Sequence, residues 1–185
     1  MRRSMATMLI GLMGLSTPLA AQQATGGALL TFGLAYTVGS GWQIQGFDAG
    51  YGRALRSGPI AAVTLGARLG EFNDQRAIIG GTQGFVFGTT LAARTRALTV
   101  GEFGSDSAPS RMGIDLTAEA TGYVGAHSPL GIGSPWGAVS LLPGFRVGNF
   151  SVVFGPTAFF GTATLVRPFL GVRFDVPLAR RERHP

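Results

Sequence analysis

One pair of neighbouring residues in this 185-residue chain, His127 and Ser128, has the side chains for nucleophilic catalysis. A serine hydroxyl becomes a nucleophile when a histidine accepts its proton and an acidic residue orients that histidine. Here the two residues are adjacent and precede Pro129, and the strand pattern described below places no acid beside them. The other histidine, His184, lies in the C-terminal segment. We therefore predict that the chain is not an enzyme and has no catalytic residues.

The sequence also lacks the motifs of cofactor, metal and nucleic-acid binding sites. The chain has no phosphate-binding loop and no metal-ligand spacing, so we predict no cofactor-binding and no metal-binding residues. The absence of cysteine excludes disulfides and thiolate metal sites. Charged residues make up 13% of the chain, about half of the roughly 25% typical of soluble globular proteins. The net charge is +6, but the arginines form no stripe with aromatic residues, so no nucleic-acid partner is expected.

Alternating apolar and polar residues recur along the chain and indicate β-strands, because successive strand side chains point to opposite faces. The clearest case is 166–178, in which every even-numbered position is apolar while Arg167, Arg173 and Asp175 lie among the odd ones. The alternation predicts eight strands, at 30–38, 42–51, 59–70, 84–98, 114–124, 139–147, 150–158 and 166–178. In the second strand the apolar positions change parity, which predicts a β-bulge near Gly46.

The predicted connections differ in length. Long loops are predicted at 71–83, 99–111 and 126–135, and a tight turn at 148–149. Small membrane barrels place long loops at one end and short turns at the other, and 99–111 does not fit that rule. Either the fourth strand continues past Leu98, or the strand count misses one hairpin.

The polar strand faces indicate how these strands assemble. They consist mostly of glycine, alanine, threonine and serine, which suit a narrow lumen better than a solvated exterior. No apolar run is long enough for a transmembrane helix, so a membrane-spanning form must be a closed barrel. We predict an all-β fold, an antiparallel up-and-down transmembrane β-barrel of eight strands. The alternative is a soluble, lipocalin-like barrel with the apolar faces turned inward.

Strand parity places ten charged residues in the lumen of such a barrel. They are Arg68, Arg94, Arg96, Arg146, Arg167 and Arg173, with Asp48, Asp115, Glu119 and Asp175. Buried charges must be paired, so we predict a nearly self-neutralising network that fills the lumen and leaves no open channel. The position of Asp48 depends on the inferred bulge. The alternative interpretation is that these residues are isolated surface charges.

Aromatic residues near strand ends resemble the girdles that membrane barrels place at the two interfaces. The candidates are Trp42, Tyr51, Trp136 and Phe150. Trp136 has the parity of the lumen, so this interpretation requires that it lie at the barrel rim.

The N-terminus has the three parts of a secretory signal: Arg2 and Arg3, an apolar core at 5–15, and small residues at 18–21. Cleavage is predicted after Ala21, with Ala20 as second choice. The organisation is therefore a cleaved signal peptide over 1–21, a barrel over 22–178 and a basic tail over 179–185. The tail is expected to be a solvated periplasmic end, with contact to anionic lipid or cell wall as the alternative.

Across residues 26–178 the chain resembles the small outer-membrane β-barrel proteins of the OmpA/OmpX type. These families end in an assembly signal, which Gly171, Phe174 and Val176 match within the segment FLGVRFDV. The chain departs from the signal at Phe169, where a polar residue is expected, and continues beyond Leu178. The resemblance implies location in a bacterial outer membrane, contact with its lipid and with the barrel-assembly machinery, and a monomeric state.

These observations favour a non-enzymatic integral outer-membrane protein with an envelope-structural or surface-interaction role through the loops 71–83 and 126–135. A soluble periplasmic lipid-binding barrel is the alternative. A third hypothesis is an outer-membrane enzyme acting on lipid, because some barrels of this kind resemble lipid A acyl hydrolases. In that family one residue separates the histidine from the serine, whereas His127 and Ser128 are adjacent.

Overall fold

The structure, a computed structural model, describes residues 27–37, 43–73, 82–104, 110–125, 135–161 and 163–178. These residues form nine β-strands. The strands are β1 (Ala28–Thr37), β2 (Gln43–Ala54), β3 (Ile60–Asn73), β4 (Thr82–Thr95), β5 (Leu98–Phe103), β6 (Ser110–Gly125), β7 (Trp136–Val147), β8 (Phe150–Phe160) and β9 (Thr164–Pro177). Within the described ranges no helix is long and apolar enough to cross a membrane.

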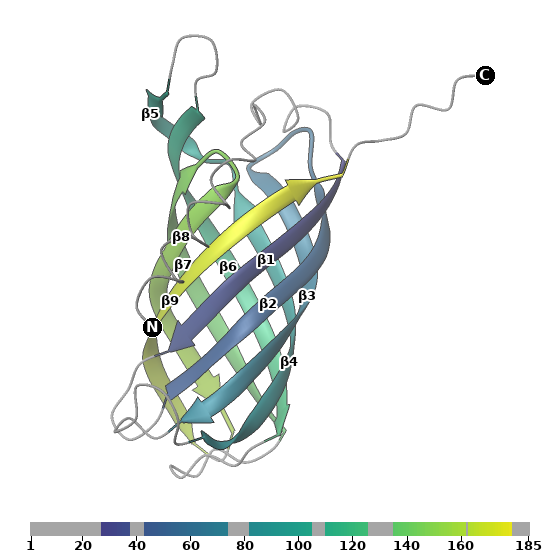
Figure 1. Ribbon diagram of the computed structural model, residues 1–185, viewed down its shortest axis with the longest axis vertical. Coiled ribbons are helices and arrows are strands. Elements are labelled where there is room, and N and C mark those ends of the chain that lie inside the picture. The colour runs from purple at the N-terminus through teal and green to yellow at the C-terminus, as the bar shows by residue number, and fades with distance from the viewer. Residues whose placement is uncertain are drawn as a thin grey trace, which may run out of the picture.

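Eight of these strands close into an antiparallel barrel (Figure 1). Each pairs with its neighbour in the chain, except that β4 pairs with β6, and the pairing of β1 with β9 completes the circle. The all-β fold and the eight-stranded barrel predicted from the alternation are therefore confirmed. We call the end at which β1 begins and β9 ends the terminal end of the barrel.

The strand β5 corrects the predicted loop at 99–111. It pairs with the first residues of β6 and forms a hairpin that projects past the barrel wall at the terminal end (Figure 1). Of the two explanations for the misfit, the missed hairpin is therefore the right one, because β4 ends at Thr95. A register shift between Thr99 and Gly101 interrupts the alternation within β5, which explains why periodicity did not reveal this strand.

The predicted bulge near Gly46 is wrong. The pairing of β2 is continuous through Gly46 with both of its neighbours, β1 and β3. The change of parity has another cause, because Ile44 is buried and points inward to an apolar cluster inside the barrel. In the sequence, an apolar residue on the inward face is easily mistaken for a change of register. Asp48 faces the lumen as predicted, but no inserted bulge residue is needed to place it there.

The outer face of the barrel is apolar, and the inner face carries the buried charged and hydroxyl side chains together with apolar clusters. In β6 the side chains of Asp115, Thr117 and Glu119 are buried, while those of Ile114 and Leu116 between them are exposed. The same alternation runs around the described part of the barrel wall. Among the outward-facing positions of its eight strands, two are charged: Arg53 near the terminal end and Glu71 near the opposite end. The middle of the wall is therefore uncharged.

Apolar and aromatic side chains fill the lumen near the end of the barrel opposite the terminal end. The cluster consists of Ile44, Val86, Tyr123, Trp136, Ala138 and Phe159, with Leu165 packed against it. The rings of Tyr123 and Trp136 are stacked with their centroids 4.2 Å apart. Trp136 is 5% exposed, so the predicted place for it in a girdle at the rim is wrong. Tyr51 and Phe150 are exposed on the outer face, and Trp42 lies outside the described residues.

Candidate functional site

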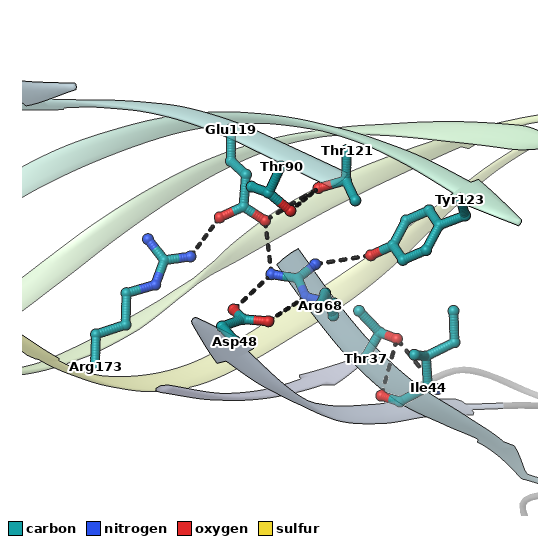
Figure 2. A network of polar contacts seen from close by, with 9 residues as sticks. All are labelled: Thr37, Ile44, Asp48, Arg68, Thr90, Glu119, Thr121, Tyr123 and Arg173. Carbon is teal, nitrogen blue, oxygen red and sulfur yellow. Dashed lines mark hydrogen bonds and ion pairs between the residues drawn. The ribbon is translucent and has the colours of Figure 1, made fainter. Parts of the chain in front are cut away.

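The buried charges of the lumen form two clusters, of which the first is centred on Arg68 of β3. Asp48 of β2 lies directly opposite in register, and its carboxylate accepts two hydrogen bonds from Arg68, at 2.6 Å from Nε and 2.8 Å from Nη2. Arg68 Nη2 also donates to Glu119 Oε1 at 2.8 Å, and Nη1 donates to the hydroxyl of Tyr123 at 2.7 Å (Figure 2). The ring of Phe169 lies 5.3 Å from the guanidinium carbon. Arg68 is thus bound on every side.

Glu119 connects this cluster to the far side of the barrel. Its Oε2 accepts a hydrogen bond from Nη2 of Arg173, which extends from β9 across the lumen (Figure 2). The hydroxyl of Thr121 lies 3.5 Å from Oε1 and 3.1 Å from the hydroxyl of Thr90. We refer to Asp48, Arg68, Glu119 and Arg173 as the first charge cluster; it contains two cations and two anions.

The second charge cluster lies nearer the terminal end and consists of Arg94, Asp115, Arg146 and Asp175. Arg146 donates from Nε to Asp115 Oδ2 and from Nη1 to Asp175 Oδ2, each at 3.0 Å. Arg94 of β4 donates from Nη1 to the same Asp175 oxygen from the other side, and its Nε lies 3.8 Å from Asp115 Oδ2. This cluster also contains two cations and two anions.

Two hydroxyl groups complete the network around the barrel. Thr31 of β1 donates to Asp175 Oδ1 at 3.1 Å, and Ser151 of β8 accepts from Arg146 Nη2 at 3.4 Å. With these two residues the clusters join all eight barrel strands. Because each cluster is neutral, the cost of removing its charges from water is offset by pairing and hydrogen bonding within the lumen.

Two of the ten predicted lumen residues lie outside the clusters. Arg96 follows the end of β4, and its guanidinium donates to the backbone oxygens of Gly58 and Leu55, at 2.6 and 2.7 Å. It therefore binds the connection between β2 and β3 at the terminal end, where strand parity no longer applies. Arg167 lies in the inward row of β9, opposite Thr157 of β8.

Several lumen partners were absent from the predicted set. Tyr123, Thr31, Ser151 and Phe169 all contact the charged side chains, as described above. Strand parity could have predicted that each of them faces the lumen, because each lies in the same inward row as a charged residue or in the inward row of a neighbouring strand. The predicted lumen set contained only charged residues and therefore left out these four. A buried guanidinium group also requires neutral acceptors and flat apolar surfaces.

Gly171, predicted as part of an assembly signal, occupies a position with no room for a side chain. A β-carbon placed there would lie 2.8 Å from the ring of Phe169 and 3.1 Å from both the backbone oxygen of Leu34 and the side chain of Val153. Phe174 and Val176 are partly buried and lie on the outward row of β9. The assembly role of the three residues stays a prediction.

We expect replacement of Gly171 by alanine to destabilise the barrel by about 1–3 kcal/mol, because the added methyl group overpacks the lumen. Gly122→Ala is the matched control, since a β-carbon there meets nothing within 4 Å. Urea unfolding of purified protein in detergent measures both without the assembly machinery. Equal stability of the two variants would refute a packing role for Gly171.

The remaining predicted features lie outside the described residues. These are His127, Ser128, the signal peptide over 1–21, the tail over 179–185 and most of the loops 71–83 and 126–135. In the described part of the chain, no group of three or more His, Asp or Glu side chains is placed to hold a metal ion.

Comparison of the chain with protein families, with curated proteins and with solved structures finds no match. The described barrel has an apolar outer wall, uncharged between its two ends, around two neutral, buried charge clusters.

Proposed function

We propose that this protein is an integral outer-membrane β-barrel protein without enzymatic activity, which has a structural or surface-interaction role in the bacterial envelope. The observation that carries the proposal is the distribution of charge across the barrel wall. Between Arg53 and Glu71 at the two ends, every outward-facing position described on the eight strands is uncharged. The charged side chains at the same depth point into the lumen.

The apolar side chains exposed on the outer wall support the proposal that this wall is in contact with lipid. Phe47 is 71% exposed and Leu65 is 60% exposed, and they belong to an apolar surface that continues around the barrel. Water-soluble monomers rarely expose apolar patches larger than a few hundred Å². In a bilayer the same surface is favourable, and a closed barrel leaves no strand edge without hydrogen bonds.

The lumen argues against the alternative of a soluble lipid-binding barrel. A lipocalin-like protein requires an apolar cavity large enough for its ligand. Here Arg68, Arg146 and the acids paired with them occupy the interior, and the aromatic cluster fills the opposite end. Such an interior supports a rigid, filled barrel that acts through its surface. The loops 71–83 and 126–135 are the proposed contact segments, and outer-membrane lipid and the assembly machinery are the proposed partners of the monomer.

Fractionation of cells that express the chain tests the proposal. We expect the protein in the outer-membrane fraction, resistant to salt and to alkaline carbonate, because its apolar wall is solvated by lipid. We also expect the unheated protein to migrate differently from the boiled protein in a denaturing gel, because the closed barrel resists detergent. Release of the protein by carbonate would refute integral membrane insertion and favour the soluble barrel.

A further inference from the structure

A cavity of about 30 Å³ lies inside the barrel at the terminal end, which is room for one or two water-sized occupants. It lies beside the second charge cluster. The residues that line it include Arg94, Arg146 and Arg173, together with Thr64, Thr117 and Ser151. The aromatic cluster closes the lumen at the opposite end. The side chains of Arg94 and Arg173 are 15% and 11% exposed, so they are less deeply buried than Arg68 at 3%.

The lining offers more hydrogen-bond donors than acceptors. The carboxylate of Asp175 also lines the cavity, and it already accepts hydrogen bonds from Thr31, Arg94 and Arg146. A guanidinium group has five N–H donors. Within the described part of the chain, Arg173 uses one of them on Glu119 and Arg94 uses one on Asp175. Arg94 and Arg173, which both line the cavity, therefore have N–H groups that form no hydrogen bond with another described residue.

The hydroxyl groups add to this excess. Neither Thr64 nor Thr117 forms a side-chain hydrogen bond with another described residue. The oxygen of Ser151 accepts from Arg146, which leaves its own proton free to donate into the cavity. Three arginines and three hydroxyl-bearing residues thus line a volume of about two water molecules, and the charges of these arginines are balanced by Asp175 in the lining and by Asp115 and Glu119 beyond it.

We propose that this cavity binds a small monatomic anion, with chloride as the physiological occupant. An anion accepts hydrogen bonds from several directions at once, and guanidinium N–H groups and hydroxyl groups without another acceptor are strong donors to it. The volume excludes sugars, nucleotides and lipid head groups. The site lies inside the barrel, so chloride binding there does not depend on the proposed function.

Chloride binding is measured on the full mature chain, folded in zwitterionic detergent, from the line width of the ³⁵Cl resonance. We expect broadening above that of the detergent alone, which bromide removes by competition. The double variant Thr64→Val, Thr117→Val removes two donors and retains every charge. It should weaken chloride binding by about tenfold or more, because hydrogen bonds to charged groups are strong.

Thr90→Val is the matched control, because Thr90 carries the same side chain in the lumen but does not line the cavity. It should leave the broadening unchanged. The proposal is overturned if the unaltered protein causes no broadening, which means that water alone occupies the cavity. It is equally overturned if the double variant, shown to be folded by its gel mobility, broadens the resonance as much as the unaltered protein. In that case surface arginines bind the ion.

Discussion

Replacement of Glu119 by glutamine is expected to destabilise the folded barrel by about 3–5 kcal/mol, the usual cost of breaking a buried ion pair by removal of one partner. The carboxylate of Glu119 accepts from Arg68 on one side and from Arg173 on the other. Without its charge, the first charge cluster has two cations and one anion in a lumen that water hardly enters. Urea unfolding in lipid vesicles, followed by tryptophan fluorescence, to which the buried Trp136 contributes, measures the loss.

A second substitution separates charge imbalance from lost packing. Glu119 is the only acid that forms an ion pair with Arg173 in the described part of the chain. Arg173→Met combined with Glu119→Gln therefore restores a neutral cluster of Asp48 and Arg68, and we expect it to recover about 1–3 kcal/mol relative to Glu119→Gln alone. A single variant that costs less than about 1 kcal/mol, or a double variant that is less stable than the single one, would contradict the network.

The second large effect concerns the outer wall. Leu65→Arg is expected to cost about 2–4 kcal/mol in lipid vesicles, because Leu65 faces outward near the middle of β3 and, in the proposed membrane-inserted barrel, a charge there would lie in the hydrocarbon region. If water bathed the wall, the same change at an exposed position would alter stability by at most about 0.5 kcal/mol. Equilibrium unfolding from vesicles decides between these outcomes.

Leu98→Arg provides the control for this measurement. Leu98 is also exposed, but it lies at the terminal end in β5, outside the barrel wall. Near the membrane interface the cost of an arginine falls to about 0–1 kcal/mol. Similar small effects at Leu65 and Leu98 would argue for a water-exposed barrel and against membrane insertion.

Alternation alone was sufficient to predict the fold and most of the inward residues. A period of two assigns every strand residue to one of two faces, whatever the partner strands are, so Asp115, Glu119 and Arg146 could be placed together on the inner face. The same rule failed where one residue broke the pattern for a local reason. Ile44 faces inward among apolar side chains, and the sequence pattern there was wrongly interpreted as a bulge. The register shift near Thr99 interrupts the alternation, so β5 was not predicted.

The sequence by itself determined two-faced strands, their approximate number and the kind of residue on each face, because these follow from local geometry. Only the tertiary structure decided which charges meet. Glu119 and Arg173, like Arg94 and Asp175, lie on strands that are not neighbours and meet across the lumen. Such contacts depend on how far the strands are staggered when the barrel closes, and no period along one strand contains that information. The division of the lumen into two neutral clusters, with a donor-rich cavity beside the second, follows from this closure.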